Sequence, residues 1–288
     1  MNDMTSPTRA LRELIGGEQL QVMPCCWDAL SARLIAEAGF PLTFMSGFAV
    51  SAARLGLPDT GLISFGEMLD QGRNICSAVS IPVLGDGDTG YGNALNVKRT
   101  VEELETAGVS ALTIEDTVLP QAYGTLGSTQ LISVEEGVGK MKAALEGRQD
   151  KNLVIAGRTS AAAVNGIEDA ITRGKAYQAV GVDAMFFVGL KTREDLEAVA
   201  AEINVPIFLG SIGPALSDKD YLSSQGVRIA LQGHQPVMAA IRATYETLKA
   251  LREGTPPSEL KGVASPDLMK QVTRDANYKA WMKDFLGG

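Results

Sequence analysis

An alternation of short apolar runs with amphipathic helical patterns is the feature that most constrains the fold of this chain. The apolar runs read as eight buried strands, at residues 21–26, 42–45, 81–84, 111–114, 153–156, 184–188, 206–209 and 227–231. Helical patterns follow them at residues 28–38, 65–79, 93–107, 133–145, 167–180, 194–203, 218–225 and 237–251. Strands that alternate with helices predict parallel βαβ units. Eight such units favour a closed (β/α)8 TIM-type barrel of the α/β class, and no Gly-x-Gly-x-x-Gly follows the first strand to favour an open dinucleotide-binding sheet.

The length fits one barrel with an added tail. The chain has 288 residues, and such barrels commonly need about 250. Helical spacing of Leu11, Leu14 and Ile15 predicts a helix before the first strand. We expect a single barrel domain over residues 1–288, with a C-terminal helical extension over about 255–288 whose last helix spans about 266–285. Long connections at 48–61 and 118–132 are the candidates for a lid over the barrel mouth.

Composition excludes several classes of function. The net charge of −8 and the pI near 4.9 argue against a surface for nucleic acid or for an anionic membrane. The first residues carry no basic-then-apolar signal pattern, and we find no run of about 18 apolar residues that would span a membrane. Three cysteines, two of them adjacent, are not the pattern of a disulfide framework. We therefore expect a cytoplasmic protein with reduced thiols.

Polar side chains follow several of the predicted strands at the point where each strand ends. In a (β/α)8 barrel the C-terminal ends of the strands meet at one rim, which is the catalytic face. The rim residues are Ser46, Asp86, Asp88, Glu115, Asp116, Arg158 and His234. Each motif is common by itself, but the shared position predicts one site.

The stretch Val83–Gly92 places two of these acids close together, among glycines that let a ligand approach the backbone. Residues two apart in an extended chain face the same side, so the carboxylates of Asp86 and Asp88 should point to one spot. Carboxylates without cysteine or histidine suit a hard cation. We expect Mg²⁺, or Mn²⁺ in its place, held by Asp86, Asp88 and Glu115 in part through waters. The alternative is a polar, glycine-rich turn that binds nothing.

The remaining rim residues suit an α-keto acid as the small-molecule substrate. A cation that binds its carboxylate and keto oxygens is a Lewis acid that stabilises an enolate. Arg158 can form a forked contact with a carboxylate or an oxyanion. Backbone amides at Ser46, Gly47 and Phe48 can hold a second carboxylate. His234 can orient the substrate or carry a proton.

Each assignment has a structural alternative. Arg158 can pair with Glu115 in the barrel interior, because a buried charge needs a partner whatever the function. A lone histidine such as His234 is more often a structural hydrogen-bonding group than a catalyst. Tyr91 can stack on the substrate, or it can merely cap the barrel mouth.

These motifs resemble the isocitrate lyase / phosphoenolpyruvate phosphonomutase superfamily. The resemblance is carried by Trp27–Arg33, Ser46-Gly47, Asp86–Gly92 and Gly108–Asp116. It implies a Mg²⁺-dependent (β/α)8 barrel that acts on α-keto acids and exchanges its last barrel helix between partners, so that we expect a homo-oligomer, a homotetramer built as a dimer of dimers. It also implies that Asp86 is the direct metal ligand and that Asp88 and Glu115 act mainly through waters. The Ser46-Gly47 pair and Arg158 would bind the substrate.

The loop after the fourth strand separates the branches of that superfamily. Here it reads Pro120-Gln121-Ala122-Tyr123-Gly124-Thr125. It lacks the cysteine and histidine of the C–C lyases and the lysine and asparagine of the phosphonomutases. The oxaloacetate decarboxylase branch is the most similar, through segments at Gly92–Val97, Leu131–Lys140 and Gly233-His234. One departure follows the seventh strand, where Gly210-Ser211-Ile212-Gly213 replaces a Tyr-Gly-Asn-type turn, and there we expect the wall of the substrate pocket to differ.

The resemblance thus implies a Mg²⁺-dependent carbon–carbon lyase that decarboxylates oxaloacetate, or a close α-keto dicarboxylate, to pyruvate and CO₂ through an enolate held by the metal. Two alternatives stay open. The chain could be another C–C or P–C lyase or mutase of the superfamily, acting on a methylisocitrate-like, substituted malate or phosphonopyruvate substrate. It could also be a dicarboxylate-binding protein with little turnover.

Overall fold

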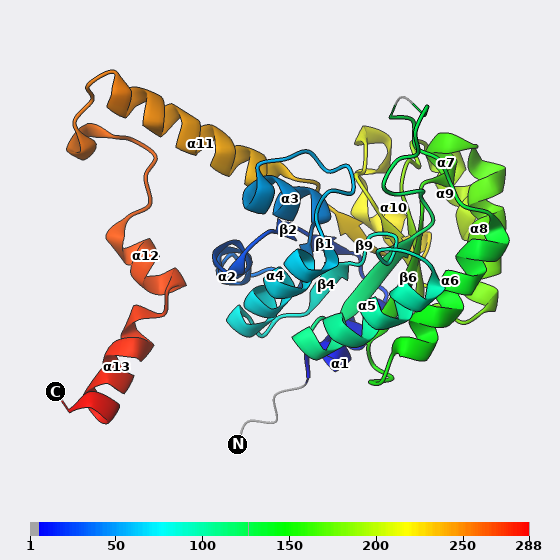
Figure 1. The fold of residues 1–288 in the computed structure, drawn as a ribbon, viewed down its shortest axis with the longest axis horizontal. Coiled ribbons are helices and arrows are strands. Elements are labelled where there is room, and N and C mark those ends of the chain that lie inside the picture. The colour runs from blue at the N-terminus through cyan, green and yellow to red at the C-terminus, as the bar shows by residue number, and fades with distance from the viewer. Residues whose placement is uncertain (1–5, 126, 288) are drawn as a thin grey trace.

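A ring of parallel strands forms the centre of the computed structural model, which describes residues 6–125 and 127–287 (Figure 1). The strands are β1 (Gln21–Met23), β2 (Cys25–Cys26), β3 (Thr43–Met45), β4 (Val83–Asp86), β5 (Ala111–Glu115), β6 (Val154–Thr159), β7 (Ala184–Phe187), β8 (Ile207–Leu209) and β9 (Val227–Leu231). Each strand pairs in parallel with its neighbour. This is the arrangement that the βαβ rhythm of the sequence predicts.

The ring closes at Pro24. β1 pairs with β9, and β2 pairs with β3. Because proline has no N–H to donate, it interrupts the ladder between these two halves of one strand. The carbonyls of Met23 and Pro24 still accept from Gln232 N and Phe44 N, both at 3.0 Å. The nine segments therefore fill eight strand positions, and the predicted (β/α)8 barrel is confirmed.

Helices surround the ring, and one of them closes the end where the strands begin. They are α1 (Pro7–Gly16), α2 (Ala29–Glu37), α3 (Gly47–Leu55), α4 (Phe65–Ala78), α5 (Ala94–Ala107), α6 (Val134–Gly147), α7 (Ala161–Val164), α8 (Ile167–Ala179), α9 (Arg193–Ala200), α10 (Lys219–Ser224) and α11 (Gln235–Arg252), with the tail helices α12 (Pro266–Val272) and α13 (Asp275–Leu286). Leu11 and Ile15 of α1 are buried with the inward side chains of the strands. The N-terminal helix therefore plugs the end of the barrel opposite the rim.

Alternation along the strands explains why the rim is polar. Phe44, Leu84, Ala111 and Ala156 belong to the apolar cluster inside the ring, and every second residue of a strand faces the same side. At the same parity the next residues are Ser46, Asp86 and Arg158, and on β5 Thr113 and then Glu115 follow Ala111. The barrel interior thus ends in a polar layer at its C-terminal rim.

Two predicted segments differ from the structure. The connection at 48–61 is not all loop, because α3 occupies Gly47–Leu55. Ser46 caps this helix by accepting from Ala49 N at 3.3 Å, and Gly56 ends it in the left-handed region with φ 64°. The single tail helix expected at 266–285 is two helices, because Arg274 between them is also left-handed, with φ 56°.

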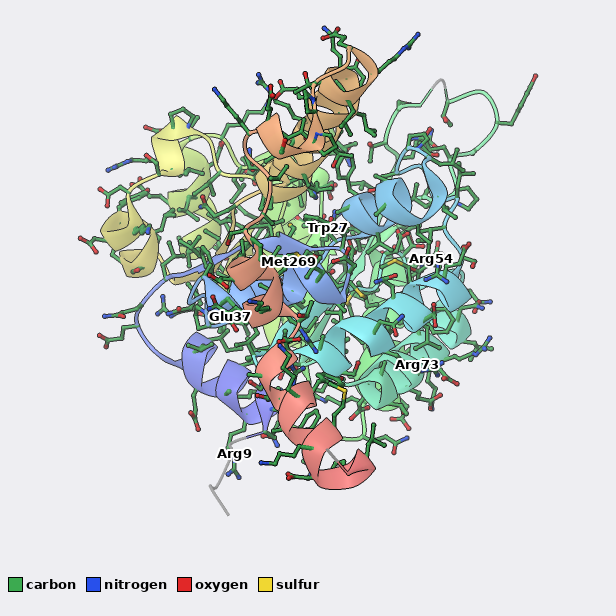
Figure 2. The ribbon with its side chains drawn as sticks, turned by 90° about the vertical axis from the view of Figure 1, so that its left-hand side faces the viewer. Arg9, Trp27, Glu37, Arg54, Arg73 and Met269 are labelled. Carbon is green, nitrogen blue, oxygen red and sulfur yellow. The ribbon has the colours of Figure 1, made fainter. Side chains whose placement is uncertain are left out.

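The helix after the last strand leaves the barrel. Figure 1 shows α11 projecting away from the ring, and Met238, Ile241, Tyr245 and Leu248 on it are exposed apolar residues. The tail then returns to α2, where Gln271 Nε2 donates to Glu37 Oε2 at 2.7 Å, and Met269 lies over the same side of the molecule (Figure 2). That barrel and tail form a single domain stays a prediction. No helix of the described residues is long and apolar enough to cross a membrane.

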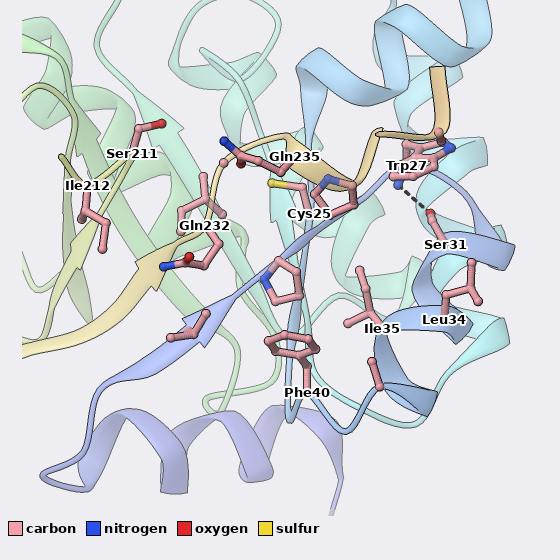
Figure 3. Close-up of a pocket in the computed structure, with 17 residues that line it drawn as sticks. Cys25, Trp27, Ser31, Leu34, Ile35, Phe40, Ser211, Ile212, Gln232 and Gln235 are labelled. Carbon is pink, nitrogen blue, oxygen red and sulfur yellow. Dashed lines mark hydrogen bonds between the residues drawn. The ribbon is translucent and has the colours of Figure 1, made fainter. Parts of the chain in front are cut away.

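An apolar groove of about 800 Å³ lies on the outside of the ring, at the position where the helix after β9 would pack in a regular barrel. Its lining includes Trp27, Leu34, Ile35, Phe40 and Ile212, and Figure 3 shows these side chains around it. The groove differs in chemistry from the polar rim, because the side chains that line it are mainly aliphatic and aromatic.

Candidate active site

Two acids from adjacent strands pair with the guanidinium of Arg158 at the rim. Arg158 Nη1 lies 3.2 Å from Asp86 Oδ1, and Arg158 Nε lies 3.0 Å from Glu115 Oε2. Strands β4, β5 and β6, which carry these residues, are neighbours in the ring. The ion pair of Arg158 with Glu115, which the sequence left open as a structural alternative, is therefore present, and Asp86 shares it.

Asp86 is the best-supported carboxylate of the group. Its oxygens accept from Gly47 N at 3.4 Å, Asp88 N at 3.2 Å and Thr113 Oγ1 at 3.5 Å, in addition to Arg158. A Cβ on Gly47 would lie 3.2 Å from Asp86 Oδ2. Glycine at this position therefore lets the start of α3 approach the carboxylate closely.

The backbone conformation that places Asp88 in the cluster differs from the predicted one. Strand β4 ends at Asp86, and Asp88 is in the left-handed region with φ 52°, so the argument from an extended chain is wrong for it. Burial, together with the negative charges of Asp86, Glu115 and Asp59, nevertheless raises the pKa of Asp88 from 3.8 to about 7. The two aspartates belong to one electrostatic cluster.

Asp59 is a fourth acid that the sequence did not assign to the site. It lies on the connection between α3 and α4, and burial followed by the charges of Asp86 and Glu115 raises its pKa. The only signal in the sequence is its place in the 48–61 connection, which was a candidate for the lid. An acid on a loop has no strand end to locate it, so spacing alone could not find it.

The donor set fits a hydrated divalent cation rather than one held entirely by the protein. In residues 6–125 and 127–287, no three histidine, cysteine or acidic side chains lie close enough to bind a metal ion directly. Four carboxylates nevertheless interact with a single arginine, and burial together with the negative charges of the other three acids raises the pKa of Asp88. Magnesium keeps several waters and takes few direct carboxylates. Direct coordination by Asp86, Asp88 and Glu115 together is thus not the arrangement seen, and the water-mediated alternative fits.

Arg158 stays charged in this setting. Burial by itself disfavours the guanidinium cation, but the charges of Glu115, Asp86 and Asp88 outweigh it and raise the pKa of Arg158 above its ordinary value. Its guanidinium carbon also lies 5.5 Å from the centre of the Phe186 ring, at the top of the apolar interior. A fixed cation is therefore available at the centre of the rim.

His234 and Ser46 meet on the far side of Asp86. Ser46 Oγ lies 2.9 Å from His234 Nε2, and the imidazole packs on the Phe48 ring with centroids 4.4 Å apart. Burial lowers the pKa of His234, while the charge of Asp86 raises it and that of Arg158 lowers it. His234 is consequently neutral near pH 7. Ser46, Gly47, Phe48 and His234 are all brought together, as the rim positions predict.

Tyr91 lies at the edge of the acids with its backbone left-handed, at φ 59°. Its ring packs on Phe65 with centroids 5.3 Å apart, and its hydroxyl is buried without a hydrogen-bond partner among the described residues. Burial, followed by the charges of Asp88 and Asp86, raises the pKa of Tyr91 well above its ordinary value. A protonated phenol with a free donor is thus available beside the cluster.

Comparisons with known proteins find relatives along the whole chain. The family model for phosphoenolpyruvate phosphomutase matches residues 11–252. A protein of Bradyrhizobium diazoefficiens named oxaloacetate decarboxylase is 54% identical over 277 residues, which cover 96% of each chain. The solved structure of phosphonopyruvate hydrolase with oxalate and Mg²⁺ has a TM-score of 0.88 at 30% identity, over 98% of this chain and 100% of that one. Oxaloacetate acetylhydrolase in complex with the inhibitor 3,3-difluorooxalacetate has a TM-score of 0.86 at 29% identity, over 98% of each chain.

Proposed function

The chain belongs to the phosphoenolpyruvate phosphomutase family, and from this premise we propose that it is an oxaloacetate decarboxylase-type lyase, which converts oxaloacetate to pyruvate and CO₂. The observation that carries the proposal is the 54% identity, along 96% of the chain, to a protein named oxaloacetate decarboxylase. The family that the motifs indicated is confirmed. The protein is accordingly a carbon–carbon lyase rather than a passive dicarboxylate binder.

The acids of the rim are the proposed site of a divalent cation, Mg²⁺ or in its place Mn²⁺. We assign Asp86 as the direct ligand, with Asp88 and Glu115 acting through water. The support is the excess of carboxylates over cationic side chains in the cluster, and the related hydrolase was solved with oxalate and Mg²⁺. When bound, such a cation supplies Lewis acidity to the keto oxygen of the substrate.

Loss of CO₂ breaks the bond between C3 and C4 of oxaloacetate. The electron pair of that bond moves into the C2–C3 bond, the keto oxygen takes the negative charge, and a proton added at C3 completes pyruvate. Arg158 is positive and fixed by Asp86 and Glu115, so it can donate to this oxygen or to the adjacent carboxylate without reorganising. Its proposed role is to stabilise the charge that develops in the reaction.

The start of α3 is the proposed holder of a second substrate carboxylate. Ser46, Gly47 and Phe48 are the N-cap and the first two residues of this helix, whose first N–H groups have no intrahelical acceptors and form the positive end of the helix dipole. His234 fixes Ser46 through the 2.9 Å contact, and because it is neutral we assign it to orientation of the substrate. The free hydroxyl of Tyr91 is a further donor on the substrate side.

The experiment measures pyruvate formed from oxaloacetate, with lactate dehydrogenase and NADH as the reporter. The purified enzyme should exceed the rate of Mg²⁺ alone, and Asp86→Asn should return the rate to that of the metal. Pyruvate formation no faster than with Mg²⁺ alone would reject the proposal. A parallel panel of phosphonopyruvate, a substituted malate and methylisocitrate separates it from the other chemistries of the superfamily, because turnover of one of these in preference to oxaloacetate would name a different reaction.

For assembly, we propose a homotetramer built as a dimer of dimers, in which α11 of one subunit covers the apolar groove of its partner. Exposed Ile241 and Leu248 on α11, and the groove beside α2, support this exchange. The measurement is the molar mass in solution by light scattering. A monomer at micromolar concentration would contradict it. We also propose that the enzyme works in the cytoplasm, and the three cysteines, which are all free, support a reducing compartment.

A further inference from the structure

Lys140 of α6 is a buried cation that the proposed reaction leaves without a role. Its residue is 3% exposed, and its Nζ donates to the carbonyl oxygen of Thr89 at 2.8 Å. Among the described residues, that partner is a backbone carbonyl rather than a carboxylate. Lysine is almost never fully buried unless it is paired. The position of this ammonium group therefore calls for a reason, and the segment it contacts is the one that follows Asp86.

Every carbonyl from Gly87 to Gly90 is held by a donor. Gly90 N donates to Gly87 O and Glu115 N donates to Asp88 O, both at 2.9 Å. Lys140 Nζ holds Thr89 O at 2.8 Å, and Thr100 Oγ1 holds Gly90 O at 3.2 Å. The two side-chain donors come from helices α6 and α5, which are outside the segment. They fix the path of the segment from two neighbouring helices.

The segment needs such support because Asp88 has a left-handed backbone, with φ 52°. Residues other than glycine adopt this region only where the surroundings hold them. The Thr89 carbonyl belongs to the peptide between residues 89 and 90, one residue beyond Asp88. A change there would release the chain that follows Asp88, and the direction of the Asp88 carboxylate would change with it. Glycine at 87 is part of the same constraint, since a Cβ there would lie 2.6 Å from Thr113 O.

We propose that Lys140 is a positioning residue for the divalent cation: by holding the carbonyl of Thr89 it fixes the left-handed conformation of Asp88 and directs that carboxylate toward the metal. This inference rests on the proposed function, because it takes the acid cluster as the metal site. Lys140 does not touch substrate or metal. It acts through the backbone of residues 88–90.

Two effects of Lys140 on metal affinity have opposite signs, which makes the proposal testable. The ammonium group shares its surroundings with the carboxylates of Glu136, Asp88, Glu115 and Asp116. If its charge were its only influence, its removal would strengthen the binding of a dication, because like charges repel. If its contact with Thr89 is what matters, removal weakens binding. The direction of the change therefore separates the two.

The experiment is calorimetric titration of Mg²⁺ into the full-length metal-free enzyme at pH 8. Lys140→Met keeps the aliphatic volume and should raise the Kd for Mg²⁺ about tenfold, as loss of an outer-shell partner commonly does. Thr100→Val removes the neighbouring support without a change of charge and should raise the Kd severalfold. Exposed Lys142 on the same helix provides the matched control, and Lys142→Met should leave the Kd within about twofold.

A second readout separates positioning from general damage to the enzyme. At saturating Mg²⁺, Lys140→Met should recover most of the wild-type kcat, whereas a misfolded protein would not, and thermal unfolding checks each variant. A Kd for Lys140→Met equal to or lower than that of the wild type, while Asp86→Asn loses Mg²⁺ binding, would overturn this inference alone. A wild-type enzyme that binds no Mg²⁺, or Asp86→Asn that binds it equally well, would overturn the proposed metal site and this inference with it.

Discussion

If Asp88 helps to hold Mg²⁺ as proposed, its raised pKa should make the binding of this cation depend on pH in a range where an ordinary aspartate would not. Burial and the charges of Asp86, Glu115 and Asp59 raise this pKa from 3.8 to about 7. Below pH 7 the folded, metal-free enzyme therefore holds a proton on Asp88, and a cation that needs the carboxylate must displace it. Apparent affinity falls as the pH falls through 7.

The size of the effect follows from the pKa. If one proton must leave, the apparent Kd is multiplied by one plus the ratio of protonated to ionised Asp88, which is about 1.1 at pH 8, about 2 at pH 7 and about 11 at pH 6. Binding should thus weaken about tenfold between pH 8 and pH 6, or about 1.4 kcal/mol. An aspartate with a pKa of 3.8 would change the Kd by about 1% over this range.

The assay is titration of the metal-free enzyme with Mg²⁺ at pH 6, 7 and 8, in buffers of different ionisation enthalpy, so that proton release is counted together with affinity. About half a proton should leave per ion bound at pH 7. Asp88→Asn is the control, and its weaker binding should show little pH dependence. His234 does not confuse the result, because its lowered pKa keeps it neutral over most of the range. The same Kd at pH 6 and pH 8 in the wild type would refute the reasoning.

Three further predictions concern the activity, the stability and the assembly of the protein. His234→Gln should lower kcat/KM for oxaloacetate about tenfold or more with little change in Tm. The variant loses the imidazole that holds the Ser46 hydroxyl but leaves the barrel core intact. Steady-state kinetics measure the first effect and thermal unfolding the second. Gly137→Ala should destabilise the protein by about 2 kcal/mol, because its Cβ would lie 2.1 Å from the hydroxyl of buried Tyr177, whereas Gly139→Ala on the same helix meets nothing within 4 Å and should be neutral or stabilising in denaturant unfolding. Ile241→Glu with Leu248→Glu should reduce the molar mass in solution, because charges would replace the exposed apolar side chains of α11; an unchanged mass would exclude α11 from the interface.

The strands, and the site residues that lie on them, could be predicted from the sequence because side chains along a strand alternate between its two faces. Apolar runs locate each strand, and the first polar residue of inward parity after the apolar layers falls on the rim. Asp86 and Arg158 follow this rule, Glu115 comes one inward position after Thr113, and the three side chains lie together. Ser46 follows the rule as well, although the helix that begins after it was expected to be a loop.

Loop-borne features could not be located in the same way. Asp59 lies on a connection whose path depends on tertiary contacts, such as the close approach of Gly61 to Pro120 on the loop at 118–132. Asp88 follows the end of β4, in a segment whose carbonyls at Thr89 and Gly90 accept from side chains of α6 and α5. The departure of α11 from the barrel is likewise invisible to periodicity, because an amphipathic helix shows an apolar face whether its own barrel or another surface covers it.

The structure separates two adjacent acids, Glu115 and Asp116, that the sequence placed together on the rim. Glu115 has inward parity and pairs with Arg158, while Asp116 comes one residue later and contacts side chains of α8 on the outside of the ring. There its Oδ2 accepts from Arg173 Nη1 at 3.1 Å and from the Tyr177 hydroxyl at 2.9 Å. Arg173 Nη1 also donates to Ile132 O at 2.9 Å, at the end of the 118–132 connection. Glu115 thus serves the rim, and Asp116 anchors the base of the loop that is the candidate to close over it.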